Sequence, residues 1–350
     1  MHSKKALIAM SGGVDSSAAA LLMQKAGFDC SGAIMRLCGD KAEDVEDARS
    51  VAGRLGIPFH VFDFSADFDE KVIGNFIRCY EAGLTPNPCI QCNRHLKFDR
   101  FLRQAQELGC DYIVTGHYAQ IRQDPESGRY LLCKAADKSK DQTYVLYCLN
   151  QEQLSHTILP LGGLSKAEAR NIAAESGFIN ARKRDSQDIC FVPDGDYVKF
   201  IKEYTGKTYP GGYYLNLDGK IVGRHNGAIC YTLGQRKGLG IALGAPAYVC
   251  AKDMEKNTVT VGPNEALYAK TLRANEWNWI PFPALTEPIR VTAKARYSQI
   301  EQPATVYPED SGYVKVVFDQ PQRALTPGQA VVLYQDDIVV GGGTIREVLP

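Results

Sequence analysis

Two cysteines with a short spacing are the first candidates for chemistry in this chain. Residues 87–95 read NPCIQCNRH, which places Cys89 and Cys92 three positions apart, directly after a proline. Such a pair can be half of a metal site, a redox pair, or a nucleophile with a neighbouring thiol. The pair alone does not distinguish these possibilities, so the choice depends on what else in the chain can reach it.

A third cysteine stands in a charged, turn-rich setting. Cys190 lies in RKRDSQDICFVPDG, 98 residues after Cys92. The basic residues 182–184 are expected to lower the pKa of the Cys190 thiol and so favour the nucleophilic thiolate. The chain has 11 cysteines, an odd number, and most are expected to be small buried hydrophobic residues of a protein in a reducing compartment. Cys89, Cys92 and Cys190 are the candidates for reactive sulfur.

A glycine loop provides a candidate phosphate site. Residues 9–17, AMSGGVDSS, follow a short apolar run and precede a helical pattern. Two glycines permit a tight turn and a close approach of a ligand to the backbone, and the free N–H groups at a helix N-terminus favour an anion. We expect Ser11 and Ser16 to donate hydroxyl hydrogen bonds to phosphate, and Asp15 to hold a Mg²⁺ ion that bridges the phosphates. The loop has neither the GxxxxGK[ST] nor the GxGxxG pattern, and a bare GG turn would be only a tight connection.

The complete SGGVDS string resembles the pyrophosphate-releasing loop of the ATP pyrophosphatase superfamily. That superfamily includes GMP synthetase, NAD synthetase, asparagine synthetase, argininosuccinate synthetase and the tRNA thiolases. The resemblance implies that a substrate oxygen attacks the α-phosphorus of ATP, which leaves AMP on the substrate and pyrophosphate in the loop. A nucleophile must then displace AMP, and in this chain the candidate is sulfur.

Strand and helix patterns alternate through the first half of the chain. The expected strands are residues 6–10, 31–37, 58–62 and 112–115. The expected helices are residues 16–26, 44–55, 68–82, 96–108 and, after a capping box that begins at Ser165, 166–176. Alternation of this kind, with helices that end at glycines, predicts a Rossmann-like α/β domain of the adenine nucleotide α-hydrolase type, with a parallel sheet.

The pattern changes after about Tyr204. Glycine becomes frequent, and short β-rich runs occur at residues 247–251, 258–261, 289–294, 313–318 and 330–334. Such runs are typical of small β domains or barrels, and a break near residues 271–276 divides them. We therefore predict a catalytic domain in residues 1–203, a central β-rich domain in 204–272 and a C-terminal β-barrel in 273–350. The barrel is expected to have its own core, so that removal of residues 272–350 leaves a folded, ATP-binding protein.

Charge and hydropathy narrow the class of protein. The formal net charge is zero, yet residues 204–273 hold nine Lys and Arg against four Asp and Glu, which mildly favours a polyanionic partner. No apolar run approaches the length that spans a bilayer, and the run at residues 6–10 is too short for a signal peptide. We expect a soluble, cytoplasmic protein with no membrane partner.

Motifs along almost the whole chain resemble those of the tRNA-specific 2-thiouridylases, which thiolate the wobble uridine of certain tRNAs. The motifs are AMSGGVDSSAAA, TPNPCIQCNRHLKF, VTGHYA, KDQTYVLY, DSQDICFV, HNGAICYTLGQRKGLGI, ARYSQ, LTPGQA and the ending GGGTIREVLP. Agreement in so many separate motifs, in the right order, identifies the chain as a member of this family.

The resemblance implies two sets of binding residues. The residues that would bind ATP are Ala9, Met10, Ser11, Gly12, Gly13, Val14, Asp15, Ser16, Met35 and Gly116. The residues that would contact the anticodon loop or the target base of tRNA are Asn87, Pro88, Cys89, His117, Lys140, Asp141, Gln142, Arg296, Tyr297 and Gln329. The central domain would contact the same RNA, with Arg236 and Lys237 as phosphate contacts, and the wobble base would leave its stack to react.

Two routes for the sulfur remain open. The resemblance makes Cys92 and Cys190 the catalytic pair: a persulfide on Cys190 attacks C2 of the adenylated uracil, AMP leaves, and Cys92 then forms a disulfide with Cys190 and releases 2-thiouridine. A cysteine desulfurase or sulfur-relay protein would reload Cys190. However, many members of the family carry aspartate where this chain has Cys89. Cys89, Cys92 and Cys190 could instead hold a [4Fe–4S] cluster whose fourth iron carries the attacking sulfide.

Two other functions compete with thiolation. A small-molecule adenylating ligase, similar to argininosuccinate synthetase, would share the glycine loop but would need neither reactive cysteines nor two β domains. A non-catalytic RNA-binding protein could keep the loop as a relic, although the intact SGGVDS string argues against that. Conversion of ATP to AMP and pyrophosphate only when tRNA is present would distinguish thiolation from both.

Overall fold

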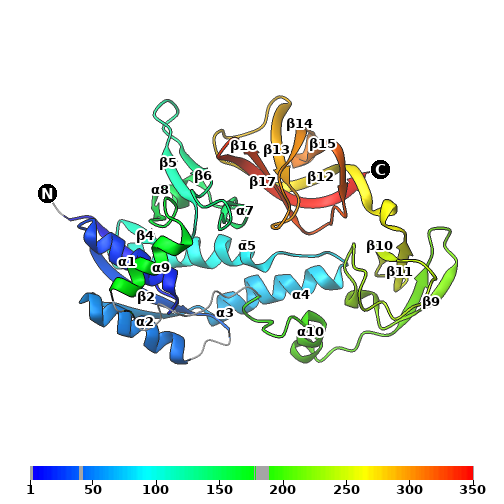
Figure 1. Cartoon of the computed structure of the whole chain (residues 1–350), viewed down its shortest axis with the longest axis horizontal. Helices are drawn as coiled ribbons and strands as arrows, with labels where there is room; N and C mark the ends of the chain where they lie inside the picture. Colours follow the sequence, from blue (N-terminus) through cyan, green and yellow to red (C-terminus); the bar gives the residue numbers. More distant parts are fainter. Residues whose placement is uncertain (1–2, 39–41, 177, 179–188, 350) are drawn as a thin grey trace.

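The first sheet is parallel and lies at the N-terminal end of the molecule (Figure 1). The computed structural model describes residues 3–38, 42–176, 178 and 189–349. The strand order is β3–β2–β1–β4–β7, with β1 Lys5–Ala9, β2 Asp29–Arg36, β3 Phe59–Asp63, β4 Tyr112–Val114 and β7 Thr157–Ile158. Successive side chains of β1 face opposite sides: Leu7 joins one buried cluster, and Ala6 and Ile8 join another. The predicted α/β domain with a parallel sheet is confirmed, and its central strand is buried on both faces, as this architecture requires.

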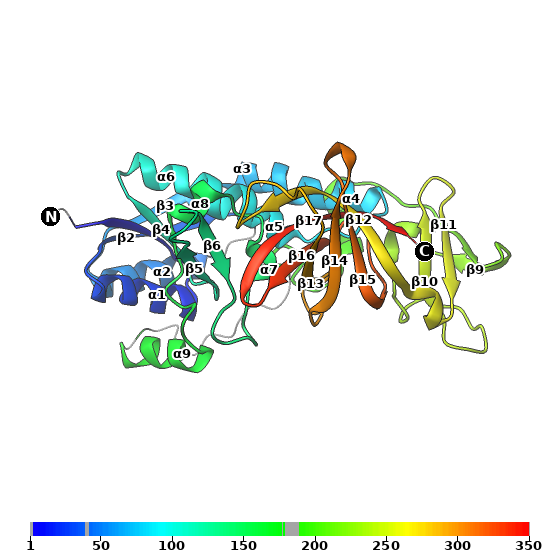
Figure 2. The same ribbon diagram turned by 90° about the horizontal axis from the view of Figure 1, so that it is seen from above.

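Helices cover both faces of this sheet (Figures 1 and 2). On one face, α1 Val14–Lys25 and α2 Ala42–Leu55 share the buried cluster of Ala6 and Ile8, and α9 Lys166–Glu175 packs on α1. On the other face, Phe68 of α3 Ser65–Phe68 shares the cluster of Leu7, and the helical stretch continues through η1 Asp69–Ile73 and α4 Gly74–Glu81 away from the sheet (Figure 1). Each glycine that was expected to end a helix follows one closely, and Gly27, Gly56 and Gly83 all have positive φ. These helices agree with the sequence-based expectation to within a few residues.

The helix after Pro88 begins earlier than predicted. The sequence pattern placed its start at Leu96, whereas the structure has α5 Pro88–Cys92, the π-helix η2 Asn93–Arg100 and α6 Phe101–Glu107 in one continuous stretch. Asn87 caps this helix, since its side-chain oxygen accepts a hydrogen bond from the Cys89 N–H at 3.1 Å. Proline is favourable at the first helical position, where its missing N–H would have no partner anyway. Cys89 and Cys92 consequently lie on the first turns of a helix rather than in a loop.

A six-stranded antiparallel barrel forms the C-terminal part. Its strands are β12 Tyr268–Trp279, β13 Ile289–Lys294, β14 Gln302–Pro308, β15 Val314–Arg323, β16 Ala330–Gln335 and β17 Ile338–Leu349. Pairing of β12 with β17 closes the sheet, which leaves it no open edge. One further pair, Ile338 with Cys133, joins β17 to the hairpin β5 Gln120–Gln123 and β6 Tyr130–Cys133 of the catalytic domain. The predicted barrel is confirmed.

The central part is a four-stranded sheet in the order β10–β11–β8–β9. Its elements are β8 Gly212–Leu215, β9 Ile221–His225, β10 Tyr248–Asp253 and β11 Thr258–Gly262, preceded by helix α10 Tyr197–Thr205. The boundaries expected after residues 203 and 272 fall inside α10 and β12, which are both unbroken elements. We therefore propose domain junctions before Tyr197 and between Gly262 and Tyr268.

The barrel has a hydrophobic core of its own and also contributes residues to a core shared with the catalytic domain. Tyr144 and Tyr147, from the catalytic domain, belong to the same buried cluster as Ile280 and Ala330 of the barrel. The Tyr144 hydroxyl donates to the Ala330 carbonyl at 2.8 Å. Tyr144 lies in α7 Thr143–Leu146, which is followed in the chain by α8 Gln151–Ser155. The expectation that the barrel has its own core is confirmed, because a separate buried cluster, which includes Leu272, Val316 and Phe318, is made of barrel residues alone. The apolar residues that close the interface with the catalytic domain come from both domains.

Candidate active site

The glycine loop lies at the end of β1 and leads into α1. Gly12 has φ +68°, and a Cβ there would lie 2.8 Å from the Asp44 carbonyl oxygen, so only glycine fits. Gly13 precedes the first turn of α1, and its carbonyl accepts hydrogen bonds of 3.0 Å from the Ser16 and Ser17 hydroxyls. The Ser11 N–H donates to Ser16 Oγ at 3.2 Å. These bonds fix the loop so that the N-terminus of α1 is available to an anion.

Residues from two other strands complete the expected nucleotide site. A Cβ on Gly116 would lie 2.9 Å from the Asp15 carbonyl carbon and 3.0 Å from the Ser16 nitrogen. The loop after β4 therefore packs directly against the glycine loop. Met35 lies half-buried near the end of β2, which pairs with β1. The nucleotide residues expected from the sequence thus gather at the carboxyl ends of neighbouring parallel strands, where α/β folds bind their ligands.

Asp15 does not have the surroundings expected of a magnesium ligand. Lys166 Nζ lies 2.8 Å from Asp15 Oδ1 and 2.7 Å from Oδ2, and the Tyr118 hydroxyl donates to Oδ1 at 2.8 Å. Both carboxylate oxygens are thus already bonded within the protein. Within the described ranges, no group of three His, Cys, Asp or Glu residues is arranged to hold a metal ion. The residues present therefore do not fit a Mg²⁺ ion held by Asp15.

The three candidate cysteines lie in one region with different exposures. All are free thiols; Cys92 is 7 % exposed, whereas Cys89 and Cys190 are exposed residues. Burial raises the pKa of Cys92, and the charges of Cys89 and Cys148 add to this effect. The Cys190 thiol is enclosed although the residue as a whole is exposed: burial, then the charges of Cys92 and Cys89, raise its pKa to about 11. These mutual effects place the sulfurs near one another, but the described residues contain no metal-binding group that would unite them.

The expected activation of Cys190 by residues 182–184 has no support in the structure. Those residues lie outside the described part of the chain. The pKa of Cys190 is raised rather than lowered, because enclosure of the thiol outweighs the nearby positive charge. An enclosed thiol of this kind is neutral near pH 7.

Lys97 is a candidate residue that the sequence analysis missed. Its positive charge opposes the pKa increase of both Cys92 and Cys190 and helps to lower the pKa of His117. Lys97 is half-buried and follows Cys92 by five residues within η2. A π-helix has wider turns than an α-helix, with hydrogen bonds between residues five apart, so Lys97 lies closer to the side of Cys92 than it would in an α-helix. The sequence NRHLKF contains this lysine, but the period of an ordinary α-helix would place its side chain on a different face from that of Cys92.

His117 follows β4 and lies close to the helix that contains Phe98. Its ring is bonded through Nδ1 to Thr115 Oγ1 at 2.8 Å and lies 5.6 Å from the Phe98 ring. Burial first, and the charge of Lys97 second, lower its pKa to about 3. His117 is therefore neutral at physiological pH and can exchange hydrogen bonds but carries no charge for RNA phosphates.

Several of the residues expected to contact tRNA make bonds within the protein. Gln329 Nε2 donates to the Thr85 carbonyl at 2.8 Å, and the Thr85 N–H donates to the Pro327 carbonyl at 3.0 Å. The barrel thereby supports the backbone just before the Asn87-Pro88-Cys89 motif. Arg296 donates to the Ala324 carbonyl at 2.6 Å.

The loop at residues 140–142 is also fixed by hydrogen bonds to other parts of the protein. Gln142 Oε1 accepts from the Tyr118 N–H at 2.8 Å, and Asp141 Oδ1 accepts from the Ala135 N–H at 2.9 Å. Lys140 is half-buried. Tyr297, by contrast, is 45 % exposed, and its pKa is raised by burial and by the charges of Asp141 and Cys89. The structure thus brings this barrel residue close to the cysteine motif.

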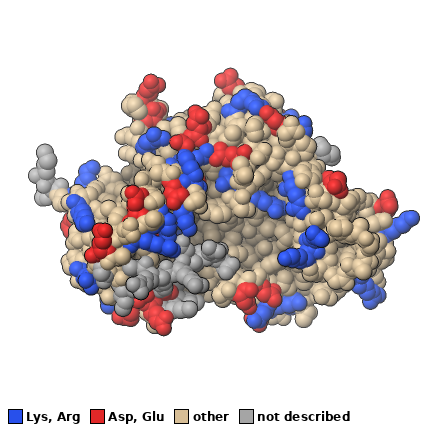
Figure 3. All heavy atoms as spheres, in the orientation of Figure 1, with Lys and Arg blue, Asp and Glu red and all other residues tan. Residues whose placement is uncertain are grey.

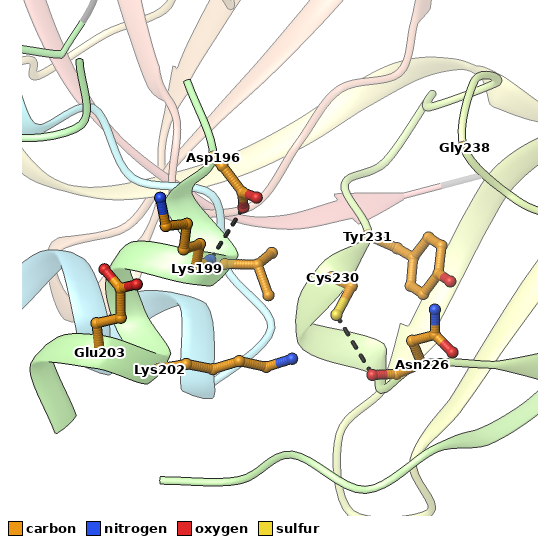
Figure 4. Close-up of a pocket in the computed structure, with 9 residues that line it drawn as sticks. Asp196, Lys199, Lys202, Glu203, Asn226, Cys230, Tyr231 and Gly238 are labelled. Carbon is orange, nitrogen blue, oxygen red and sulfur yellow. Dashed lines mark hydrogen bonds between the residues drawn. The ribbon is translucent and has the colours of Figure 1, made fainter. Parts of the chain in front are cut away.

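Basic side chains surround a hollow on one face of the molecule. Figure 3 shows Lys and Arg on both sides of this hollow. Arg236 and Lys237 are exposed in a turn of the central domain. A separate cavity of about 520 Å³ lies between α10 and the central domain, and Figure 4 shows Lys202 on one side of it and Cys230 on the other. That cavity contains none of the three candidate cysteines.

Comparisons with known proteins cover the whole chain. Three protein-family models match in sequence: the tRNA methyl transferase HUP domain at residues 4–194, the tRNA methyl transferase PRC-barrel domain at 198–263 and the aminomethyltransferase β-barrel domain at 269–345. The tRNA-specific 2-thiouridylase MnmA of Clostridioides difficile is 49 % identical over 357 residues, with 99 % of each chain covered. The protein of the same name from Acetivibrio thermocellus is 50 % identical over 359 residues, with 99 % of this chain and all of that protein covered.

Similarity to solved structures is weaker. A 4-thiouridine synthetase bound to RNA and ATP has 17 % identity and a TM-score of 0.39, over 58 % of this chain and 50 % of that chain. A TM-score of 0.39 is too low to support an inference about function. In the described part of the chain, no helix combines the length and the apolar character that crossing a bilayer would need.

Proposed function

Because this chain belongs to the tRNA-specific 2-thiouridylase family, we propose that it uses ATP to thiolate C2 of the wobble uridine in tRNA, as a tRNA-uridine 2-sulfurtransferase. The observation that carries this proposal is identity of 49 % to a named 2-thiouridylase over 99 % of both chains. Two features of the geometry support it: Gly116 packs against the glycine loop, and the charge of Lys97 affects the pKa of His117, Cys92 and Cys190. A small-molecule ligase of the same superfamily is not favoured, because it would require neither the thiols nor the barrel.

The first step is adenylation of the base. The uracil C2 oxygen attacks the α-phosphorus of ATP, the bond to the β-phosphate oxygen breaks, and pyrophosphate leaves. The N–H groups at the start of α1 and the hydroxyl of Ser11 bind the departing phosphates. The adenylated C2 then carries AMP as a good leaving group.

The second step is sulfur transfer by a persulfide. The terminal sulfur of a Cys190 persulfide attacks C2, and the C2–O bond breaks to release AMP. The Cys92 thiolate then attacks the inner sulfur, the sulfur–sulfur bond breaks, and the electron pair stays with the sulfur on C2. The products are 2-thiouridine and a Cys92–Cys190 disulfide, which an external dithiol must reduce. We favour this route over the [4Fe–4S] cluster because the three sulfurs are not arranged as a ligand set in the described residues.

The remaining partners follow from this chemistry. The persulfide comes from a cysteine desulfurase or a sulfur-relay protein, which must reach the thiol of Cys190. The wobble uridine would enter beside Cys89 and Tyr297, with the anticodon loop in the basic hollow (Figure 3). Reactive free thiols suit the reducing cytoplasm.

The test uses purified protein, unmodified tRNA transcripts, ATP and a persulfide donor. Pyrophosphate and AMP should form only with tRNA, and mass spectrometry of the digested tRNA should reveal 2-thiouridine. Cys190→Ser should retain tRNA-dependent pyrophosphate release and make no thiouridine. Cys250→Ser, which changes a half-buried thiol of the central sheet, is the matched control and should behave as wild type. Pyrophosphate release without tRNA, or full activity of Cys190→Ser, would refute the proposal.

Iron analysis of the anaerobically purified protein decides between the two sulfur routes. Under the persulfide route the protein binds no iron, and Cys89→Ser thiolates tRNA from a persulfide donor at a rate near that of wild type. Stoichiometric iron and sulfide that are lost together with activity in Cys89→Ser would instead establish the cluster.

A further inference from the structure

Asp15 takes part in an enclosed ion pair at the point where the nucleotide loop becomes a helix. Its carboxylate receives Lys166 Nζ at 2.7 and 2.8 Å and the Tyr118 hydroxyl at 2.8 Å. The Lys166 side chain is only 11 % exposed, and its ammonium group also lies 5.7 Å from the centre of the Tyr118 ring. Charge-assisted bonds of this kind are the strong ones, because little water competes for the two groups.

The two partners of Asp15 are themselves held in place. Lys166 is the first residue of α9, and a capping box fixes that helix start: the Ser165 N–H donates to Glu168 Oε2 at 2.7 Å, and the Glu168 N–H donates to Ser165 Oγ at 3.2 Å. Tyr118 is 3 % exposed, and its N–H donates to Gln142. A lysine at a helix N-terminus opposes the helix dipole. The ion pair with Asp15 offsets that unfavourable placement.

The charge balance explains how the loop can accept phosphate without a metal at Asp15. A lone carboxylate next to the glycine loop would repel pyrophosphate. Paired with Lys166, the carboxylate contributes little net charge, and the anion encounters the N–H groups of α1 instead. The ion pair connects the first turn of α1 to α9, and the hydrogen bond from Tyr118 to Asp15 connects it to the loop after β4.

We propose, on the basis of the function proposed above, that Asp15, Lys166 and Tyr118 form a clamp that holds the nucleotide loop in its phosphate-binding shape. Lys166 and Tyr118 are positioning residues that act through Asp15. The Asp15 carboxylate binds these two side chains instead of a Mg²⁺ ion. The metal that accompanies ATP is then held by the nucleotide phosphates and water, which is common for Mg²⁺.

The test compares Asp15→Asn, Lys166→Met, the double variant, Lys166→Arg and Tyr118→Phe in full-length protein. The measurements are kcat and KM for ATP in tRNA-dependent pyrophosphate release, the Mg²⁺ concentration for half-maximal rate, the melting temperature and the Kd for tRNA. The clamp predicts that each single neutralising change raises KM for ATP about tenfold or more, and that the double variant is no worse than either, because coupled residues are not additive. Lys166→Arg should recover most of the loss, and Tyr118→Phe should have a smaller effect.

Two further readouts distinguish the clamp from a metal site and from a general effect of surface charge. The Mg²⁺ requirement and the Kd for tRNA should match wild type in every variant. Arg103→Met, which removes an exposed ion pair with Asp99, is the control for loss of a surface charge pair and should leave KM for ATP unchanged.

Three outcomes would overturn the clamp. If Asp15→Asn raises the Mg²⁺ requirement and Lys166→Met does not, Asp15 is a metal ligand. If the losses of the two single variants multiply in the double variant, the residues act independently. If the melting temperature falls with no change in KM for ATP, the pair is only structural. Absence of tRNA-dependent pyrophosphate release in wild type would instead count against the proposed function itself.

Discussion

At the scale of single residues, enclosure and one lysine determine the charge states in the site. Burial raises the pKa of the Cys92 and Cys190 thiols and lowers that of His117, so each of the three groups is neutral near pH 7. Lys97 influences all three groups. A thiolate must form before sulfur chemistry can proceed, so the lysine favours the charged form that the enclosure opposes.

Replacement of Lys97 by methionine should therefore impair sulfur transfer. Without the positive charge, the pKa of Cys190 should rise further above about 11, so that alkylation of Cys190 by iodoacetamide at pH 8–9 becomes slower. Thiolation should fall by about tenfold or more, which corresponds to one pKa unit or more of lost thiolate stabilisation. Peptide mass spectrometry after timed alkylation measures the first effect, and single-turnover thiolation measures the second. Lys97→Arg should be nearly normal; equal alkylation rates in Lys97→Met and wild type would contradict this role.

His117 should make the stability of the protein depend on pH. In the unfolded chain its pKa is near 6.5, and in the folded protein it is about 3. Below pH 6.5 the His117 ring is protonated in the unfolded state but stays neutral in the folded state. The free energy of unfolding should therefore decrease as the pH falls from 6.5 toward 3. Urea unfolding at pH 7.0 and 5.0 should show a smaller decrease for His117→Gln than for wild type. An equal decrease in both proteins would mean that His117 is not enclosed.

At the scale of elements, a run of glycines in β17 allows close contact with the catalytic domain on one side and with the paired barrel strand β12 on the other. A Cβ on Gly342 would lie 2.6 Å from the Tyr147 ring, and one on Gly343 would lie 2.9 Å from the Trp277 ring. The Asn278 side chain, from the paired strand β12, donates to the Tyr147 carbonyl at 2.6 Å. Glycine weakens an isolated strand, but here it marks a close approach between neighbouring elements.

Gly342→Ala should consequently destabilise the protein. The added methyl group would overlap the buried Tyr147 ring, and overpacking of this kind costs about 1–3 kcal/mol. Thermal or urea unfolding measures the change in the free energy of unfolding. Gly163→Ala is the matched control, because a Cβ at Gly163 meets nothing within 4 Å, and it should be neutral or slightly stabilising. Equal stability of the two variants would show that the contact can relax.

At the scale of the whole molecule, the barrel is part of the catalytic unit. It shares the core that contains Tyr144 and Tyr147, and the Ile280 carbonyl accepts hydrogen bonds from Arg129 at 2.8 Å and Gln151 at 3.1 Å. The contact between Gln329 and Thr85 also reaches the segment that leads into the cysteine motif. The barrel therefore affects both the stability of the catalytic domain and the position of Cys89.

Removal of residues 268–350 should therefore give an unstable protein rather than an independent ATP-binding domain. The truncation would expose the buried rings of Tyr144 and Tyr147 and leave their hydrogen-bonding groups without protein partners. We expect poor solubility, or a melting temperature many degrees below that of the full chain, measured by calorimetry. A soluble truncation that unfolds cooperatively near the wild-type temperature and binds ATP would contradict the shared core.

The sequence by itself determined the features that depend on local chemistry. The parallel α/β sheet, the barrel, the glycine loop and the family follow from short periodic patterns and contiguous motifs, since helix and strand periods and tight turns are set by residues close in the chain. Even the early start of the helix at Pro88 had a local signal, in the cap at Asn87. The domain junctions expected from local patterns stay a prediction, and α10 and β12 run through the places where composition changes.

Only the tertiary structure decided the partners of the reactive groups. Asp15 was assigned to a metal from its place in the loop, but its carboxylate contacts Lys166, 151 positions away. The tRNA contact of Gln329 stays a prediction, but its side chain also donates to Thr85, 244 positions away. Enclosure raises the pKa of Cys190, whereas the basic residues nearby in the sequence predict a lowered pKa. Contacts and desolvation between distant segments exist only once the chain has folded, so no pattern of neighbouring residues can specify them.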